Sequence, residues 1–390
     1  MPGLIFFMAP DVIFPVVLRQ IDINSLDMKN FGLLVCFVVV AVGAFARGIS
    51  VVDDGDGVAV AGASVFGRGG IILGMTDADG HLDGLSDEDF PVTVKCLGYE
   101  TALASADQTE LRLSPVSYEL HEVEVTPADR PVMRLVCYIR EYSGAATATD
   151  TVQLYSEHMA DFFIPVAKVK KFKAQTRPRV LNSRLYARSR TRDGRDSVYR
   201  PGTREDAMSW VDMLELPVAD VKESDAIRAG AGSDIRQGKY WIKQRSRKTD
   251  NMYAFTVDYL ADKKDHRMSP ALFKLLGFTL DFNELNTSWA YRPNKEGIYT
   301  PRDLVYGTMT MAVCGRGKWI KKAFNSDTPV DINGLFEIYP VESEYLTVEE
   351  AKALMRDDTA GMPMRQSPDV LPLPAATQRL VELVDALDGK

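Results

Sequence analysis

Residues 253–259 have the sequence YAFTVDY, in which large apolar or aromatic residues alternate with small or polar ones. The alternation recurs at residues 278–283 (FTLDFN) and at residues 305–313, where Val305, Met309, Met311 and Val313 are separated by Tyr306, Thr308 and Thr310. A period of two places alternate side chains on opposite faces of a strand. These stretches predict a mainly β protein with a curved antiparallel sheet, one face of which is buried.

Short helices are expected around these strands. Ser269-Pro270 is typical of a helix start and Gly277 of its end, while Thr347 and Glu350 have the spacing of a capping box for a helix through about Asp357. Residues 358–374 are rich in Pro and small residues and predict a linker. Residues 375–388 predict a short amphipathic helix with Leu380, Leu383, Val384 and Leu387 on one face.

The length and the charge distribution of the chain both indicate more than one domain. Its 390 residues, 46% hydrophobic and 26% charged, fit two or three domains and exclude collagen-like, low-complexity and wholly disordered classes. The net charge of −8 hides an asymmetry, because residues 48–129 hold 16 acidic and three basic side chains whereas residues 168–204 hold 13 basic and two acidic ones. This reversal predicts two units, 47–127 and 130–357, followed by the linker and helix of residues 358–390.

The acidic unit has the pattern of short strands separated by turns. Apolar stretches at residues 49–52, 58–65 (interrupted at Gly62) and 92–96 predict strands, and the Asp/Gly-rich residues 53–57 and 77–80 predict turns. Turns at this spacing are typical of a β-sandwich of about 80 residues.

The glycines and turns of this unit match a known pattern. Gly48, Asp53 and Gly57 are followed by GASV at residues 62–65, GMTDADG at residues 74–80 and LGYE at residues 97–100. Residues 48–125 thus resemble the carboxypeptidase regulatory-like domain, although residues 59–61 and Leu82 depart from its pattern. The resemblance implies an immunoglobulin-like or transthyretin-like sandwich on a cell-envelope protein of Bacteroides-type bacteria. Residues 136–165 and 338–356 resemble envelope proteins in which a second β-rich domain of no assigned activity follows.

The N-terminal part has the features of an export signal. Met28-Lys29-Asn30 precedes an uncharged run at residues 31–46 that ends Ala44-Phe45-Ala46. A basic start, a short apolar run and small residues before the cleavage point predict a signal peptide at residues 28–46, cleaved after Ala46. We expect translation to begin at Met28, so that residues 1–27 are not part of the protein; a retained N-terminal anchor is the alternative. The protein is therefore expected in the periplasm or at the outer membrane.

Catalytic and metal-binding motifs are weak. The His-x-x-Glu pair of zinc carboxypeptidases does not occur, and a strand would place His158 and Asp161 on opposite faces, so His158 is expected to be a surface histidine. The mature chain keeps Cys96, Cys137 and Cys314, which allow one disulfide at most. No Gly-x-Ser-x-Gly, P-loop or Gly-x-Gly-x-x-Gly motif is present, so we expect no cofactor and favour a non-enzymatic protein over an enzyme.

Two charged patterns remain as candidate sites. Asp53, Asp54, Asp77 and Asp79 would bind calcium only if the two turns met at one end of the sandwich, and turn formation alone also explains them. The cationic stripe consists of Arg188, Arg190 and Arg192 and of Lys243, Arg245 and Arg247 at alternate positions. It would suit the anionic groups of a polysaccharide, lipid or envelope protein; alternatively, it is a solvated face or faces the acidic sandwich.

The sequence favours a non-enzymatic function in binding, scaffolding or assembly. Partners would be an envelope protein, a polysaccharide, a lipid or the membrane itself, and export argues against nucleic acid. A first alternative is a carrier whose curved sheet holds an apolar ligand in a cavity lined by Tyr253, Phe255, Phe278, Met309 and Met311. A second is a periplasmic hydrolase, which would need a cleft with two carboxylates, or Cys with His, in contact.

Overall fold

The computed structural model describes most of the chain beyond the expected signal peptide. The described residues are 47–116, 129–147, 150–166, 169, 172–191, 193–207, 209–217, 221–222, 232–237, 240–249, 252–260, 278–324, 326–357, 361–367 and 370–388. The expected signal peptide and the helix expected at residues 269–277 lie outside this set. The described chain is mainly β, as predicted, with a sandwich followed by a large antiparallel sheet.

Seven short strands form the N-terminal sandwich. They are β1 (Arg47–Asp53), β2 (Ser64–Phe66), β3 (Ile72–Met75), β4 (His81–Leu85), β5 (Val92–Lys95), β6 (Ala102–Ala104) and β7 (Glu110–Leu113). One sheet has the order β4-β1-β7 and the other β3-β2-β5-β6. Alternate residues such as Val51, Val65 and Val94 meet between the sheets in a buried core.

Residues 58–63 do not form the predicted strand. Ala59 makes a single bridge to Val52, and Gly62 turns the chain with a φ of +79°. Thr76 secures this turn, because its hydroxyl donates to the Val60 carbonyl (2.7 Å) and accepts from the Ala63 N–H (2.8 Å). The segment therefore lies against the large sheet instead of extending β2.

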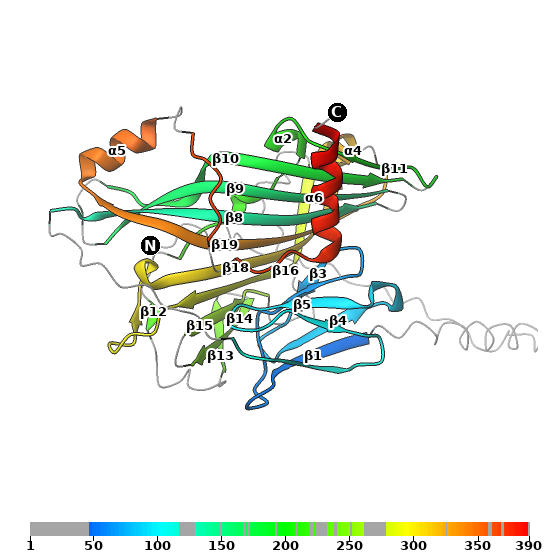
Figure 1. The fold of residues 1–390 in the computed structure, drawn as a ribbon, viewed down its shortest axis with the longest axis horizontal. Coiled ribbons are helices and arrows are strands. Elements are labelled where there is room, and N and C mark those ends of the chain that lie inside the picture. The colour runs from blue at the N-terminus through cyan, green and yellow to red at the C-terminus, as the bar shows by residue number, and fades with distance from the viewer. Residues whose placement is uncertain are drawn as a thin grey trace, which may run out of the picture.

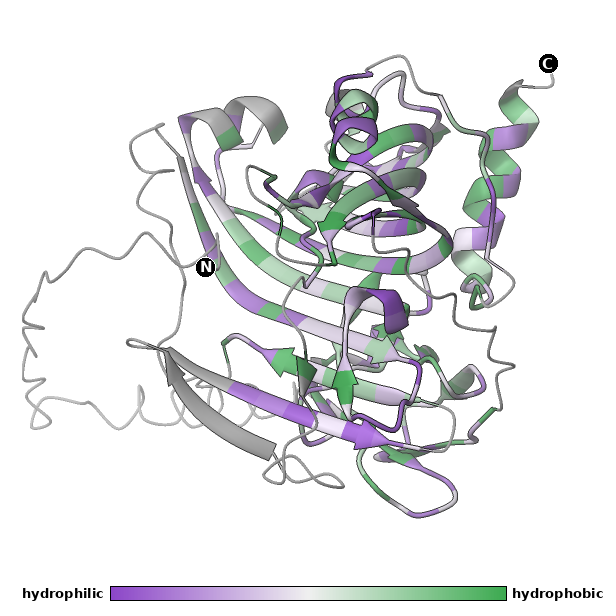
Figure 2. Cartoon of the chain, turned by 90° about the vertical axis from the view of Figure 1, so that its left-hand side faces the viewer, coloured by the Kyte–Doolittle hydropathy of each residue, from purple (hydrophilic) through white to green (hydrophobic). Residues whose placement is uncertain are grey.

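The second unit contains one ten-stranded antiparallel sheet with the order β11-β10-β9-β8-β19-β18-β16-β15-β14-β13. Its strands are β8 (Val132–Ala146), β9 (Thr151–Pro165), β10 (Gln175–Arg190), β11 (Asp196–Tyr199), β13 (Gly232–Gln237), β14 (Tyr240–Lys248), β15 (Tyr253–Asp258), β16 (Phe278–Tyr291), β18 (Leu304–Gly317) and β19 (Val330–Leu346). The first and last strands, β8 and β19, pair at the centre and join two meanders. The long strands curve strongly (Figure 2).

Smaller elements complete the unit. They are α2 (Arg204–Ala207), η3 (Val211–Met213), the strand pair β12 (Val221–Lys222) and β17 (Ile298–Tyr299), η5 (Pro301–Asp303), α4 (Lys318–Phe324), α5 (Val348–Arg356) and α6 (Ala375–Asp388), with η2 (Asp87–Asp89) in the sandwich. Thr347 caps α5 with the predicted capping box, and α6 forms where a helix was expected.

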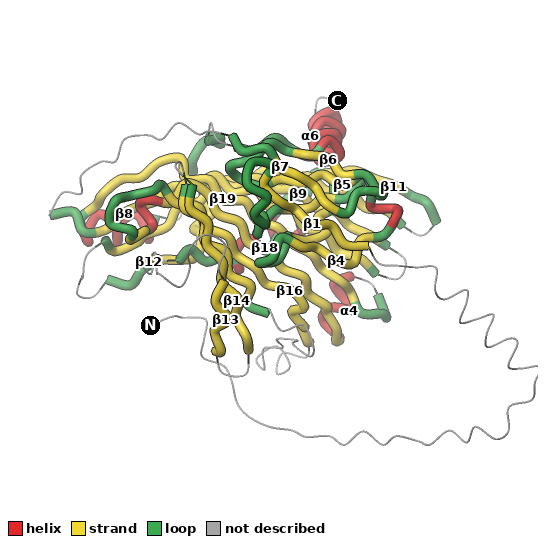
Figure 3. The backbone as a smooth tube through the Cα atoms, turned by 90° about the horizontal axis from the view of Figure 1, so that it is seen from below, coloured by secondary structure: helices red, strands yellow, loops and turns green. Residues whose placement is uncertain are grey.

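Both faces of the large sheet are buried at its centre, which corrects the prediction of one buried face. Leu135, Cys137 and Ile139 of β8 belong to the main core, in which Val211, Leu214 and Leu216 cover the sheet. Val136 and Tyr138 point the other way and are equally buried. The sandwich, residues 361–367 and 370–374, and α6 cover this second face (Figures 1 and 3). Polar residues on that face were thus mistaken for solvent-facing ones.

Candidate functional site

A cavity of about 320 Å³ lies where the sandwich meets the large sheet. This volume is near the lower end of the roughly 300–1,000 Å³ of small-molecule pockets. Its walls are residues 58–62, Ala78, Asp79, Cys96, Leu97 and Tyr99 from the sandwich, and Arg245, Ser246, Arg247, Met252, Ala254, Thr256, Ser288, Ala290, Tyr306 and Thr308 from β14, β15, β16, β18 and the turn before β15.

Strand register builds the sheet wall of the cavity. Arg245 pairs with Thr256, Thr256 with Ser288, and Ser288 with Thr308, so one polar side chain from each of four strands lies in a row. The row continues through Glu337, Arg140, Glu157 and Arg184 across the sheet. We call these eight residues the polar row. Directly opposite residues share a face of the sheet, so the row is continuous on the sandwich side.

A second row of cross-strand pairs, next to the polar row, explains why side chains do not fill the cavity. Arg247 pairs with Ala254, Ala254 with Ala290, and Ala290 with Tyr306. The two alanines carry only a methyl group, and the facing segment contains Ala59, Ala61 and Gly62. A Cβ atom on Gly62 would lie 3.1 Å from the Ser288 Cβ, so the backbone approaches the sheet closely there. Small residues on both walls thus leave the cavity open.

Arg245 and Arg247 of the cationic stripe line this cavity, and together with Lys243 they face the acidic sandwich. Lys243 and Arg245 both contact Asp79, and the Arg245 Nη2 to Asp79 Oδ1 distance is 3.1 Å. Arg247 Nη2 lies 2.5 Å from Asp53 Oδ2 and 3.4 Å from Asp56 Oδ2. The basic strand and the acidic turns therefore neutralise each other within the chain, which was one of the arrangements considered from the sequence.

These contacts keep the carboxylates ionised. The hydrogen bond from Lys243 lowers the pKa of Asp79, with Arg245 acting in the same direction against desolvation. Burial acts to raise the pKa of Asp53, but hydrogen bonds from the Gly55 N–H and the Tyr99 hydroxyl, together with the Arg247 charge, hold it below its ordinary value. Charge-assisted hydrogen bonds of this kind fix the rim of the cavity.

Arg247 has one donor atom without an acceptor. Its guanidinium lies 5.5 Å from the centre of the Tyr99 ring, and its Nη2 is occupied by Asp53 and Asp56. Its Nη1 is buried and has no hydrogen-bond partner among the residues that the structure describes. Leaving a buried donor unsatisfied costs about 1–3 kcal/mol, and more when the group is charged.

Next to the cavity, a buried ion pair ties the sandwich to the polar row. Lys95 Nζ lies 2.9 Å from Glu337 Oε1, and both side chains are 0% exposed. Arg140, Tyr142 and Tyr339 complete the surroundings of Glu337. Burial lowers the pKa of Lys95, whereas the Lys95 and Arg140 charges hold the pKa of Glu337 below its ordinary value against desolvation. The pair fixes the sandwich on the sheet.

Arg188 and Arg190 lie apart from Lys243, Arg245 and Arg247. They belong to β10, near the opposite edge of the ten-stranded sheet, where both contact Asp196 of β11. Arg192 lies outside the described residues. The structure therefore does not bring the two halves of the predicted stripe together.

His158 is not a surface histidine, contrary to the prediction. It is 0% exposed, with Nδ1 2.8 Å from Ser183 Oγ and Nε2 2.9 Å from Ser156 Oγ. Glu141 lies 3.4 Å from Nε2 and accepts from the Ser209 hydroxyl (2.5 Å) and the Trp210 N–H (2.8 Å). Alternation along β9 places His158 on the main-core face, where Glu141 supplies its polar partner.

The predicted apolar residues lie on the face of the sheet away from this cavity. Tyr253, Met309 and Met311 are buried in the main core and Phe255 packs against it. The Tyr253 and Tyr299 rings stack at 4.1 Å. Phe278 begins β16, but its side chain is outside the described set. The four described residues therefore pack against the chain itself.

Of the candidate calcium ligands, Asp53 and Asp77 accept hydrogen bonds from backbone N–H groups of their own turns. Asp53 Oδ1 accepts from the Gly55 N–H at 2.7 Å, and Asp77 Oδ1 accepts from the N–H groups of Asp79 (2.9 Å) and His81 (3.0 Å). Asp54 is exposed at the first turn. The described residues contain no group of three or more His, Cys, Asp or Glu placed to bind a metal. Cys96, Cys137 and Cys314 are free, and burial raises the pKa of Cys96 to about 12.

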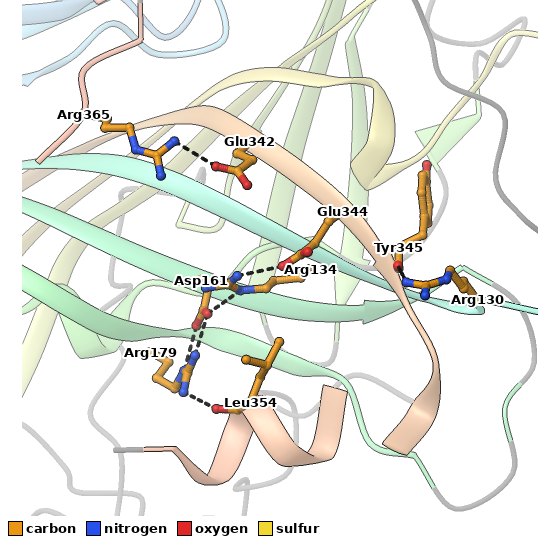
Figure 4. Close-up of polar contacts among 9 residues, drawn as sticks. All are labelled: Arg130, Arg134, Asp161, Arg179, Glu342, Glu344, Tyr345, Leu354 and Arg365. Carbon is orange, nitrogen blue, oxygen red and sulfur yellow. Dashed lines mark hydrogen bonds and ion pairs between the residues drawn. The ribbon is translucent and has the colours of Figure 1, made fainter. Parts of the chain in front are cut away.

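A further charged cluster fastens α5 to the sheet (Figure 4). Asp161 is fully buried and receives hydrogen bonds from Arg134 at 2.8 Å and from Arg179 at 2.7 and 2.8 Å. Arg134 also bonds Glu344 (2.7 Å), and Arg179 donates to the Leu354 carbonyl at the end of α5. The charges of this cluster are paired with one another, so we interpret the cluster as the attachment of α5 to the sheet.

No protein-family model matches the chain, and no curated protein matches it. Within the described part of the chain, no helix has the length and apolar character needed to cross a membrane.

Proposed function

We propose that this chain is an exported cell-envelope protein with a non-enzymatic binding function, and that its ligand site is the cavity between the sandwich and the large sheet. The expected signal peptide at residues 28–46 and the envelope-type sandwich pattern support the location. The cavity supports binding, because sites for small molecules occur preferentially at the interfaces between domains.

The observation that carries this proposal is a cavity between the two units whose walls are held in place by ion pairs. The Lys95–Glu337 pair and the rim pairs of Asp53 and Asp79 connect both walls. A site that is already formed binds without the entropic cost of ordering its walls.

The two alternatives have less support. The carrier alternative needs room on the main-core face, and Val211, Leu214 and Leu216 fill that face beside Met309 and Met311. The hydrolase alternative needs an accessible cluster, and the Glu141–His158 contact is fully buried. Five donors surround the Glu141 carboxylate and tie residues 209–210 to the sheet, which is a structural role.

Small molecules retained by the protein test the proposal. We would purify the mature chain from the periplasm of a Gram-negative host, where it is expected to begin at Arg47, and identify released compounds by mass spectrometry. Ala254→Phe fills the cavity and should remove the retained compound. Ala353→Phe, on the exposed side of α5, is the matched control and should retain it. Equal release from native protein and Ala254→Phe, with thermal unfolding showing both folded, would reject the cavity as the site.

A further inference from the structure

We infer that the ligand of the cavity between the sandwich and the large sheet is a small uncharged molecule, an alcohol or a carbonyl compound with a compact apolar body. This inference rests on the proposed function, because it assumes that the cavity is a binding site. It adds the chemistry of the ligand, which follows from three features of the lining: paired charges at the rim, small apolar side chains inside, and one accessible hydroxyl group.

The charges at the rim are balanced within the chain. Three cations pair with three carboxylates, namely Lys243, Arg245 and Arg247 with Asp53, Asp56 and Asp79. Against desolvation, hydrogen bonds and the adjacent cations keep the pKa values of Asp53 and Asp79 below the ordinary value, so both carboxylates stay ionised at neutral pH. A charged ligand would have to displace one of these partners or lie in the cavity unpaired, and an unpaired charge away from water is costly. An uncharged ligand disturbs none of the pairs.

Inside the rim, the side chains that keep part of their surface free are mostly small and apolar. The half-buried residues of this kind in the lining are Val58, Ala59, Ala61, Cys96, Met252 and Ala254. Burial raises the pKa of the Cys96 thiol to about 12, so this group is uncharged as well. With a volume of about 320 Å³, the cavity suits a compact apolar body and excludes a long acyl chain or an oligosaccharide.

Ser288 supplies one neutral polar contact. It is half-buried, whereas Thr256 and Thr308, its neighbours in the polar row, are 6% and 1% exposed. Ser288 Oγ lies 3.0 Å from Thr256 Oγ1, and either hydroxyl can be the donor of this hydrogen bond. In both cases Ser288 keeps a proton or a lone pair for a further partner. A hydroxyl or a carbonyl group on the ligand would meet this need without adding charge.

Titration calorimetry at pH 7 with three probes of one shape tests the ligand class. The probes are cyclohexylmethanol, cyclohexanecarboxylate and cyclohexylmethylammonium, which share the same ring and differ in charge. We expect the alcohol to bind in the millimolar range or below, at least about tenfold tighter than either ion. Its affinity should not change with salt, because salt screens the contacts of a charged ligand and not those of a neutral one.

Two variants test the two polar features separately. Ser288→Ala removes the hydrogen-bonding group and should weaken binding of the alcohol roughly three- to tenfold. Asp79→Asn leaves an excess positive charge at the rim, so it should strengthen binding of the carboxylate at least about threefold and change that of the alcohol by less than about twofold.

Matched controls make the same changes on exposed residues away from the cavity. Ser197→Ala lies on β11 at the opposite edge of the large sheet, and Asp327→Asn alters a side chain that is 99% exposed. Both should bind the three probes like the native protein. Thermal unfolding verifies that each variant is folded.

The outcomes separate this inference from the proposed function. The inference is overturned if either ion binds the native protein as tightly as the alcohol, if none of the probes binds in the millimolar range, or if Ser288→Ala and Asp79→Asn leave all affinities unchanged. In each of these cases the cavity remains a binding site provided that Ala254→Phe loses the retained compound. If Ala254→Phe also retains that compound, the proposed function fails as well.

Discussion

Asp53, at the junction of the two units, shows how the surroundings of a carboxylate decide its protonation and its contribution to stability. Asp53 begins an Asp/Gly-rich turn of a kind usually exposed to solvent, yet it is 5% exposed and contacts Tyr99 and Arg247. Its carboxylate links a loop of the sandwich to β14. A buried carboxylate with several donors is stabilised in its ionised form, so its contribution to stability depends on pH.

Asp53→Asn should lower the free energy of unfolding at neutral pH by about 1–3 kcal/mol, since it removes a charged acceptor from buried donors. The folded-state pKa lies below the ordinary value of 3.8. The stabilisation is therefore present above pH 3.8 and is lost as the pH falls through the lower folded value. Urea unfolding over this range should show the native protein approaching the variant on acidification. Asp327→Asn, at a side chain that is 99% exposed, is the control, and equal profiles for native protein and Asp53→Asn would contradict the expectation.

Among the secondary-structure elements, α6 shows that only part of a predicted apolar helix face is buried. The pattern predicted that Leu380, Leu383, Val384 and Leu387 share one buried face. Leu380 and Val384, four residues apart, are buried against Tyr142, Tyr155 and Tyr186 of the large sheet, whereas Leu383 is 42% and Leu387 48% exposed. The helix forms as expected, but half of its apolar stripe stays outside the contact.

A matched pair of leucines measures this difference. Leu380→Ala should lower the free energy of unfolding by about 2–5 kcal/mol, because it leaves a cavity beneath α6. Leu383→Ala, with the same chemical change, should cost no more than about 0.5 kcal/mol. Urea unfolding followed by circular dichroism provides both values. Similar losses in the two variants would mean that α6 does not pack on the sheet in this orientation.

At the scale of the whole molecule, the sandwich and the large sheet are joined by buried polar contacts as well as apolar ones. Lys95 of β5 reaches Glu337 at the centre of β19, and Thr308 contacts Met75 of β3. Phe66 of β2 packs edge-on against Tyr142 of β8 at 5.0 Å. Because these contacts lie between the units, we expect the described parts to unfold together in a single transition.

Lys95→Met should remove one of the two cations beside the buried Glu337 carboxylate and leave Arg140 as its remaining partner, at a cost of roughly 3 kcal/mol. Scanning calorimetry should then show separate transitions for the sandwich and the sheet. Adding Glu337→Gln removes the buried charge and should restore part of the loss, because Arg140 loses its carboxylate partner in the same step. Lys321→Met, at an exposed pair with Asp327, serves as the control and should change stability by no more than about 0.5 kcal/mol. A single unshifted transition in Lys95→Met would show that the pair does not couple the two units.

Local patterns were sufficient for much of the fold. Alternation in residues 253–259 and 305–313 predicted β15 and part of β18, and Thr347 with Glu350 predicted the cap of α5. Such signals are readable because they depend on neighbours within a few residues. Of the strand predicted at residues 58–65, only Ser64 and Val65 lie in a strand, since Thr76 ties the Val60 and Ala63 backbone into a turn.

The sequence by itself determined the β class, the change from an acidic to a basic unit, and the position of α5 and α6. Only the tertiary structure decided which charges meet and which faces are covered. The row from Arg245 to Thr308 joins residues from four strands, and the Lys95–Glu337 pair spans 242 positions. Register and domain packing are set by the sum of many distant contacts, so a local pattern places a side chain on a face without showing what that face meets.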